Sequence, residues 1–105
     1  MKLLTKELIA RFEGVGSQEE VQDPLVIAKF FNPSGAGTWL ATEYESDSKI
    51  FFGFVSIFGD YNDEWGYFSL NELENYIGRF GLSIERDLYF TEQRMSKVMP
   101  SAILE

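Results

Sequence analysis

The pattern of apolar and polar positions predicts a helix close to the N-terminus. Four apolar residues there fall on one helical face: Leu4, Leu8, Ile9 and Phe12. Thr5 belongs to the residue types that cap helix N-termini, whereas Gly14 belongs to those that end helices. We therefore expect a helix over residues 5–13, followed by a polar, glycine-containing loop.

A second helix is expected in the C-terminal half. Ser69 and Glu72 have the spacing of a capping box, in which each side chain accepts a hydrogen bond from a free backbone amide at the helix start. Apolar residues then recur at helical spacing until Gly81: Leu70, Leu73, Ile77 and Phe80. This pattern predicts a helix over residues 70–79.

Four other segments have the apolar, β-branched and aromatic composition of strands: residues 25–32, 38–45, 50–58 and 65–68. We expect the first of them to be the central strand. The connections 46–49 and 59–64 are short and polar, which predicts two antiparallel hairpins.

Alternation along the second of these strands predicts which side chains share a face of the sheet. Glu43 and Glu45 alternate with Trp39 and are expected on its face. Leu40 and Tyr44 are expected on the opposite face, so the side of this strand that carries Glu43 and Glu45 is predicted to be exposed to solvent.

These elements predict an α+β fold, with a small antiparallel sheet of about four strands and two helices packed on it. Residues 82–90 are expected to form an extended stretch that ends in a short strand. A length of 105 residues suits one domain, residues 1–105. Residues 91–105 hold few core candidates, so we expect a loosely ordered tail in which Ile103 and Leu104 can dock.

Composition narrows the chemistry that this fold can perform. The chain has 17 acidic and 9 basic residues, a net charge of −8, no histidine and no cysteine. It therefore lacks any side chain whose ordinary pKa lies near neutrality, and it lacks thiolate nucleophiles, disulfides and soft metal ligands. A serine triad is excluded without histidine, and no glycine-rich loop is followed by the lysine of a phosphate-binding site.

The negative charge also opposes direct binding to nucleic acid and to anionic membranes. The first residues reach a charged pair before any apolar run of signal-peptide length. No run approaches the roughly 20 apolar residues of a transmembrane helix. We expect a cytoplasmic protein that binds neither nucleic acid directly nor a membrane, whose oligomeric state the sequence does not specify.

One acidic loop has oxygen ligands at alternate positions, as a calcium site requires: Asp60, Asn62 and Glu64. The glycine of a calcium loop falls one place late, at Gly66, so we expect a solvated hairpin loop instead. Paired acids elsewhere are explained by helix capping or by the wet side of a sheet. We therefore predict no metal, no cofactor and no catalytic residue.

The distribution of the acids is the main functional signal. Eight of them fall in one hairpin–loop–helix region and are predicted to bind a partner: Glu43, Glu45, Asp47, Asp60, Asp63, Glu64, Glu72 and Glu74. If they share a face, they imitate the phosphates of a duplex and can occupy the basic groove of a nucleic-acid-binding complex. An acidic surface that serves only solubility is the alternative.

Six segments of the chain resemble one bacterial family: residues 1–8, 29–31, 39–43, 51–53, 66–74 and 81–90. The family is catalogued as domain of unknown function 2958, and the resemblance spans nearly the whole chain. It has no established activity. Its members resemble cargo of plasmids, phages and integrative elements, which implies an accessory role on a mobile element. The loop between Glu45 and Lys49 is shorter than is common in the family.

Two hypotheses follow from these observations. The first is a non-catalytic acidic accessory protein that acts by binding a protein partner, in its sharpest form a DNA-mimic inhibitor of a CRISPR or restriction complex. The second is a small-molecule-binding or hydrolytic enzyme with a carboxylate/arginine site at Glu43, Arg86 and Asp87. Because Arg86 lies between two acids, we favour a structural ion-pair cluster for it.

Overall fold

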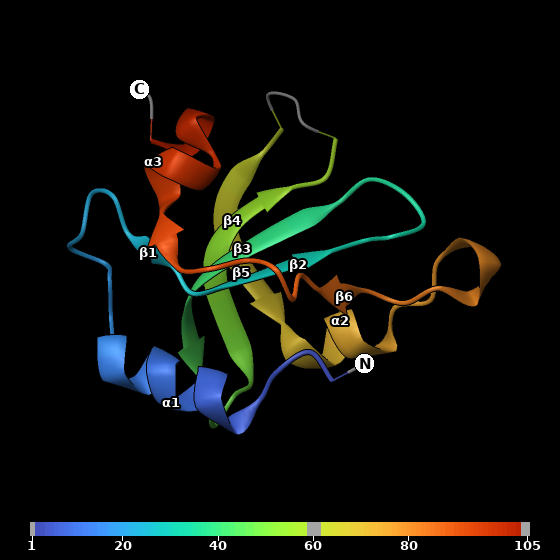
Figure 1. The fold of residues 1–105 in the computed structure, drawn as a ribbon, viewed down its shortest axis with the longest axis horizontal. Helices are drawn as coiled ribbons and strands as arrows, with labels where there is room; N and C mark the ends of the chain where they lie inside the picture. Colours follow the sequence, from blue (N-terminus) through green and yellow to red (C-terminus); the bar gives the residue numbers. More distant parts are fainter. Residues whose placement is uncertain (1, 59–61, 104–105) are drawn as a thin grey trace.

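The computed structural model of the protein describes residues 2–58 and 62–103. A five-stranded antiparallel sheet, in the order β5-β4-β3-β2-β6, forms the centre of the fold (Figure 1). Its strands are β2 (Ala28–Phe31), β3 (Thr38–Glu45), β4 (Ile50–Ser56), β5 (Glu64–Ser69) and β6 (Glu85–Arg86). A second sheet pairs β1 (Leu25–Val26) with β7 (Gln93–Arg94). The predicted α+β class is confirmed, with more strands than expected.

Both predicted hairpins are present, since β3 pairs antiparallel with β4 and β4 with β5. The predicted position of the central strand is wrong, because β3 has that place. Residues 25–32 divide at Ile27, whose N–H donates to the Ala41 carbonyl at 2.9 Å. The chain before this point pairs with β7, and the chain after it forms β2, next to the edge strand β6.

A β-bulge at Thr42 interrupts the alternation of β3. Ala41 lies opposite Gly53, whereas Glu43 lies opposite Phe52, so the register shifts by one residue between the two pairs. A bulge adds one residue to one strand and thereby reverses the direction of every side chain that follows. We call the side of the sheet that carries Ala41 the first face and the other side the second face.

The bulge overturns the predicted assignment of faces. Tyr44 packs on the first face with Trp39, and its ring centroid lies 4.7 Å from that of Phe51. Glu43 lies on the second face with Leu40, the reverse of the expectation. The prediction was wrong because it assumed that side chains alternate between the two faces along the whole strand, whereas the bulge interrupts that alternation.

Gly53 makes the bulge possible. A Cβ atom there would overlap the carbonyl oxygen of Leu40, so the two strands approach one another more closely than any other residue allows. Gly66, its neighbour on β5, has no atom within 4 Å of the place where a Cβ would be. The close approach is therefore confined to the β3–β4 pair.

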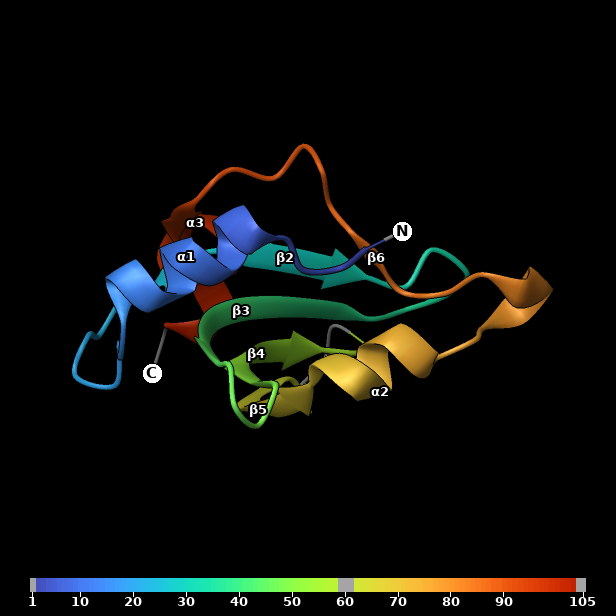
Figure 2. The ribbon, with the colours of Figure 1, turned by 90° about the horizontal axis from the view of Figure 1, so that it is seen from below.

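Helices α1 (Lys6–Val15) and α2 (Leu70–Asn75) cover the first face (Figure 2). Twelve buried residues form this core: Leu3, Leu4, Phe12, Ile27, Ala28, Phe30, Ala41, Phe51, Phe68, Leu70, Leu73 and Ile84. Phe51 has no exposed surface and contacts four other rings, from α1 and from three strands. It is the centre of the covered face.

The predicted N-terminal helix is confirmed, and its cap is Thr5, whose Oγ1 accepts a hydrogen bond from the N–H of Leu8 at 3.2 Å. The helix ends later than expected. Gly16, and not Gly14, has a left-handed φ of 70° and donates its N–H to the Phe12 carbonyl at 2.9 Å.

The second predicted helix starts as expected and is shorter than predicted. The Ser69 hydroxyl oxygen accepts a hydrogen bond from the N–H of Glu72 at 3.2 Å. Tyr76 is extended, so α2 ends at Asn75, and residues 77–83 form a small projecting hairpin that we call the arm. It contains the 3-10 turn η1 (Arg79–Gly81). The helical spacing of the apolar residues after Asn75 therefore belongs to exposed positions, not to the core.

The C-terminal segment covers part of the second face through α3 (Met95–Val98) and the 3-10 turn η2 (Pro100–Ala102). Figure 1 shows α1 and α3 on opposite sides of the sheet. The core here is smaller: Val26, Leu40, Phe54 and Met95. Ile103 packs against it as expected, whereas Leu104 lies outside the described residues.

Asp23 fastens this segment to the body. Its carboxylate accepts hydrogen bonds from the Ser96 hydroxyl at 2.6 Å and from the Ser96 N–H at 2.9 Å. Met95, the residue before Ser96, is completely buried, so residues 91–103 contribute more to the core than we expected. That residues 91–105 are loosely ordered in solution stays a prediction. Within residues 2–58 and 62–103, no helix has the length and apolar character needed to cross a bilayer.

Candidate functional site

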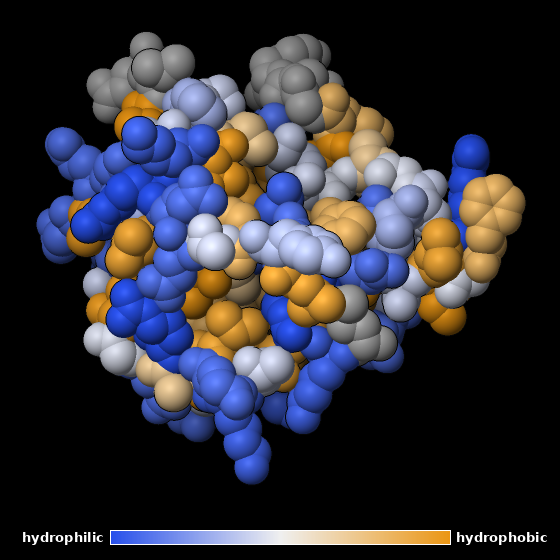
Figure 3. All heavy atoms as spheres, in the orientation of Figure 1, coloured by the Kyte–Doolittle hydropathy of each residue, from blue (hydrophilic) through white to orange (hydrophobic). Residues whose placement is uncertain are grey.

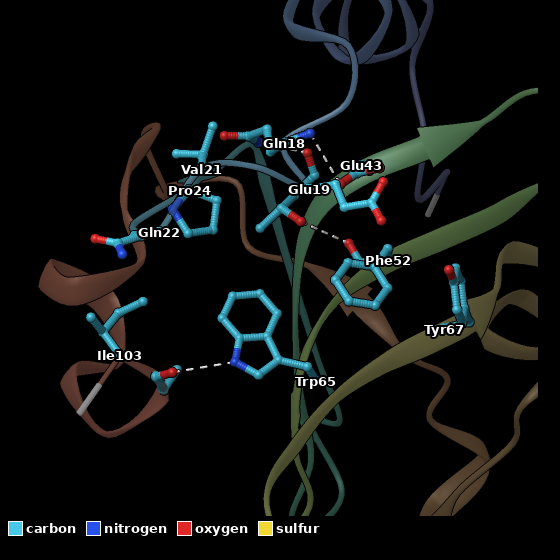
Figure 4. A pocket seen from close by; sticks show the side chains of 12 residues that line it. Gln18, Glu19, Val21, Gln22, Pro24, Glu43, Phe52, Trp65, Tyr67 and Ile103 are labelled. Carbon is cyan, nitrogen blue, oxygen red and sulfur yellow. Dashed lines mark hydrogen bonds between the residues drawn. The ribbon is translucent and has the colours of Figure 1, made fainter. Parts of the chain in front are cut away.

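The second face is only partly covered, and an open hollow of about 750 Å³ lies on its uncovered part (Figure 4). The floor consists of side chains from three adjacent strands: Glu43, Phe52, Trp65 and Tyr67. The loop before β1 and the end of the C-terminal segment form the walls. A concave site of this size on a rigid sheet is the usual setting for ligand binding.

The aromatic rings of the floor form a continuous row. Phe52 stacks against Trp65 with ring centroids 6.0 Å apart and contacts Tyr67 edge-on at 5.0 Å. Trp65 also packs edge-on against the buried Phe54, and its indole N–H donates to the Ala102 carbonyl at 3.2 Å. Tyr67, at the open end, is 78% exposed. The row is held at its inner end and presents ring surface to solvent at its outer end.

Gln18 fixes the loop that forms the upper wall in Figure 4. Its side-chain amide donates to the carbonyls of Leu25 at 2.9 Å and Thr42 at 2.8 Å, and it accepts from the Leu25 N–H at 2.7 Å. Its backbone N–H donates to the Glu43 carboxylate at 3.1 Å. Gln18 is only 6% exposed, so these bonds satisfy a buried polar side chain and tie the wall to the bulge of β3.

A smaller hollow, of about 420 Å³, adjoins the first along the row of Glu43, Phe52 and Tyr67. Four carboxylates line the two hollows: Glu13, Glu19, Glu43 and Glu45. Among the described lining residues there is no lysine or arginine. We call the two hollows together the acidic groove. Charges of one sign along a concave surface concentrate the field within it, so the acidic groove favours cations.

The seven predicted acids that the structure describes do not form one surface. Near the β3–β4 turn, backbone N–H groups of Ser48 and Asp47 donate to Glu45 and hold its pKa below the ordinary value. Burial raises the pKa of the Tyr44 hydroxyl, and the charges of Glu74 and Glu45 raise it further, which places both acids close to that ring. Glu45, Asp47 and Glu74 thus belong to one end of the hairpins.

Two further acids lie at the opposite end of β4. Asp63 accepts a hydrogen bond from the Ser56 hydroxyl at 2.8 Å, and Glu64 begins β5 beside it. Ser56 is six residues from Ile50 along the strand, which corresponds to roughly 20 Å. Glu72 lies in the first turn of α2, on the first-face side, and Asp60 lies outside the described residues.

Among the predicted acids that the structure describes, Glu43 and Glu45 alone line the acidic groove. The sequence analysis missed Glu13 and Glu19, because the groove assembles them from distant parts of the chain. One signal for the ring row was present, since Trp65 and Tyr67 alternate around Gly66 and therefore share a face.

The structure does not assemble the alternative carboxylate/arginine site. Arg86 lies on the edge strand and donates to the carbonyls of Lys2 at 2.7 Å and Leu3 at 2.9 Å, which anchors the N-terminal segment. Asp87 lies 3.6 Å from the Lys29 ammonium. Both line a different hollow from Glu43. Within the described parts of the chain, no group of three or more acids is arranged to hold a metal ion.

Comparison with known proteins gives a family and no closer relative. No curated protein and no solved structure matches the chain. A family model described as "Protein of unknown function (DUF2958)" matches residues 3–103, nearly the whole length of the α+β fold. The chain therefore belongs to the family of proteins of unknown function DUF2958.

Proposed function

We propose that this protein acts without catalysis, by binding a basic segment of a protein partner in the acidic groove. The observation that carries the proposal is the combination of four carboxylates with an exposed ring row, and with no cation among the described lining residues. A ligand that is both positively charged and able to stack on rings matches these two properties together.

Arginine is the side chain that fits the acidic groove best. Its guanidinium group pairs with carboxylates through two parallel hydrogen bonds and also stacks on aromatic faces. Tyr67 offers an exposed ring beside the carboxylate of Glu43. A lysine ammonium forms the ion pair but lacks the planar stacking surface, so lysine is expected to bind more weakly.

This chemistry suits a partner that handles nucleic acid, because such proteins present arginine and lysine on their working surfaces. The proposed binding agrees with the hypothesis of an accessory protein of mobile elements that inhibits a host defence complex in the cytoplasm. Such binding requires no direct contact with nucleic acid. It differs from duplex mimicry in one respect. The predicted acids that the structure describes are divided between the two ends of the hairpins, so the attraction is local to the acidic groove.

Fluorescence of Trp65 tests the proposal. In a Trp39→Phe background, Trp65 is the only tryptophan and reports directly on the ring row. The probes are three short synthetic peptides. Glycine alternates with arginine in the first, with lysine in the second and with glutamate in the third. We expect the arginine peptide to change the emission at the lowest concentration, and the glutamate peptide to have no effect.

Two matched variants locate the binding. Glu43→Gln removes a charge but keeps an acceptor for the Gln18 N–H, and it is expected to weaken arginine-peptide binding about fivefold to tenfold. Glu64→Gln, at the far end of the hairpin, is expected to change it less than twofold. Equal loss in both variants would favour a diffuse acidic surface over the acidic groove, and no binding of the arginine peptide would contradict the proposal.

A further inference from the structure

The arm carries a bulky apolar side chain in a conformation that disfavours it. Phe80 has φ 61° and ψ 20°, and Gly81 follows with φ 71°. The Leu82 N–H donates to the Arg79 carbonyl at 3.1 Å across these two residues. Two successive residues with positive φ and this hydrogen bond make a type I′ turn, in which asparagine or glycine is the usual first residue.

The side chain of Phe80 is hardly packed against its own chain. It is 91% exposed, and Ile77 on the same arm is 73% exposed. The arm projects from the body at the right-hand edge of the molecule, where apolar surface reaches its end (Figure 3). A strained, exposed phenylalanine at the end of a projecting hairpin lowers the stability of the isolated chain and leaves the ring accessible to another molecule.

The arm is held firmly enough to present this ring. The Gly78 N–H donates to the Leu82 carbonyl at 2.7 Å, and Ile77 pairs with Ser83 in an antiparallel bridge. A Cβ atom at Gly78 would overlap the Ser34 hydroxyl, so the base of the arm rests against the β2–β3 turn. A fixed base limits the conformational entropy that is lost when the end of the arm is bound.

An apolar hollow lies beside the base of the arm. Its volume is about 380 Å³, and its apolar lining comes from the sheet, from α2 and from residues that flank β4 and the arm: Trp39, Ile57, Tyr67, Phe68, Leu73, Tyr76 and Ile84. Glu72 lines its rim, whereas the arm carries Arg79, which makes no ion pair with any described residue. The arm and this hollow are thus complementary in polarity and in charge.

We propose that two copies of this chain associate by exchanging arms, with Phe80 of each copy in the apolar hollow of the other. A projection and a matching cavity that adjoin on one surface allow a two-fold interface, in which each contact occurs twice and the assembly closes at a dimer. The apolar hollow and the acidic groove meet at Tyr67, which lines both of them.

Sedimentation of the full chain at increasing protein concentration tests the proposal. We expect a monomer–dimer equilibrium, and Phe80→Ala is expected to weaken it about tenfold or more. Tyr89→Ala is the control, because Tyr89 is another exposed ring, 96% exposed, in a different loop. A wild-type chain that stays monomeric, or a Phe80→Ala variant that associates like the wild type, would overturn the proposal.

Ionic strength separates this contact from binding in the acidic groove. Each copy has a net charge of −8, so salt screens the repulsion between copies and strengthens an apolar contact. Peptide binding in the groove is expected to weaken with salt. Association that weakens as salt rises would contradict an exchange driven by Phe80.

Cross-linking identifies the surfaces, because the chain contains no cysteine of its own. Arg79→Cys and Glu72→Cys chains, mixed and mildly oxidised, are expected to give a disulfide-linked heterodimer of distinct mass. Tyr89→Cys mixed with Glu72→Cys serves as the control and is expected to remain unlinked. If the chain forms a dimer but the Arg79→Cys and Glu72→Cys chains remain unlinked, the dimer uses another surface and the assignment is overturned.

Discussion

Adjacent residues of one strand show how differently the two faces of the sheet are covered. Phe51 points to the first face and has no exposed surface, whereas Phe52 points to the second face and is partly exposed. Within the described residues, two helices cover the first face, whereas a short C-terminal segment covers part of the second. The residue type does not decide which ring is buried. What decides it is how much of the chain elsewhere packs over each face.

The largest effect should come from truncating the two rings in turn. Phe51→Ala removes the centre of the first core and is expected to lower the free energy of unfolding by about 3–5 kcal/mol. Phe52→Ala is expected to lower it by about 1 kcal/mol, because less of its surface is buried. Urea denaturation followed by circular dichroism measures both. Similar losses would mean that the two faces contribute equally to stability.

The bulge that sends Glu43 to the second face gives the next largest effect. Gly53→Ala forces a Cβ against the Leu40 carbonyl and is expected to cost about 2 kcal/mol of stability. Gly66→Ala, directly across the β4–β5 pair, is the matched control and is expected to be nearly neutral. If the control is as costly as Gly53→Ala, the loss comes from strand glycines in general and not from the bulge.

The arm packs on neither face, and a substitution there is expected to raise the stability of the chain instead of lowering it. Phe80→Asn places a residue that tolerates positive φ at the first position of the turn and is expected to raise the stability of the dilute monomer by about 1 kcal/mol. The thermal midpoint of unfolding measures this gain. A lower midpoint would show that Phe80 stabilises its own chain.

The smallest effect concerns the cover of the second face and depends on pH. Hydrogen bonds from the Ser96 hydroxyl and N–H hold the pKa of Asp23 below its ordinary value of 3.8. The stability that these bonds give is complete above that value and is lost as the pH falls through the lower pKa of the folded chain. Acid should therefore loosen the C-terminal segment.

Each face carries one tryptophan, which makes this measurable. Trp65 contacts the C-terminal segment, whereas Trp39 packs against the first core. With only Trp65 present, the emission is expected to change at a higher pH than with only Trp39 present. In Ser96→Ala the Trp65 transition should move to still higher pH. Coincident transitions in all these variants would show that the segment unfolds together with the rest of the chain.

The sequence predicted the elements whose signals are local. The strand over residues 38–45 and the first helix follow from alternation and from the cap at Thr5. The second helix was predicted too long, because Ile77 and Phe80 repeat at helical spacing although they lie on the arm. The bulge at Thr42 could not be predicted, since it depends on the close approach of β3 to β4 at Gly53.

The candidate site was predicted less well than the fold. The local count of acids included Glu43 and Glu45, which line the acidic groove, but grouped them with acids at the far end of the hairpin. Glu13 and Glu19 join them only after α1 and the following loop fold against the sheet. Sequence distance does not reveal such a grouping, because it arises from tertiary packing.

Gln18 has a consequence for how the acidic groove responds to its surroundings. An amide side chain carries no proton that titrates, so three of the four bonds that fasten the wall keep their strength at any pH at which the chain is folded. These bonds join uncharged groups, so salt does not screen them, whereas it does screen the attraction between the carboxylates of the groove and a cationic ligand. Rising ionic strength therefore weakens the electrostatic attraction while the wall that receives the ligand keeps its contour.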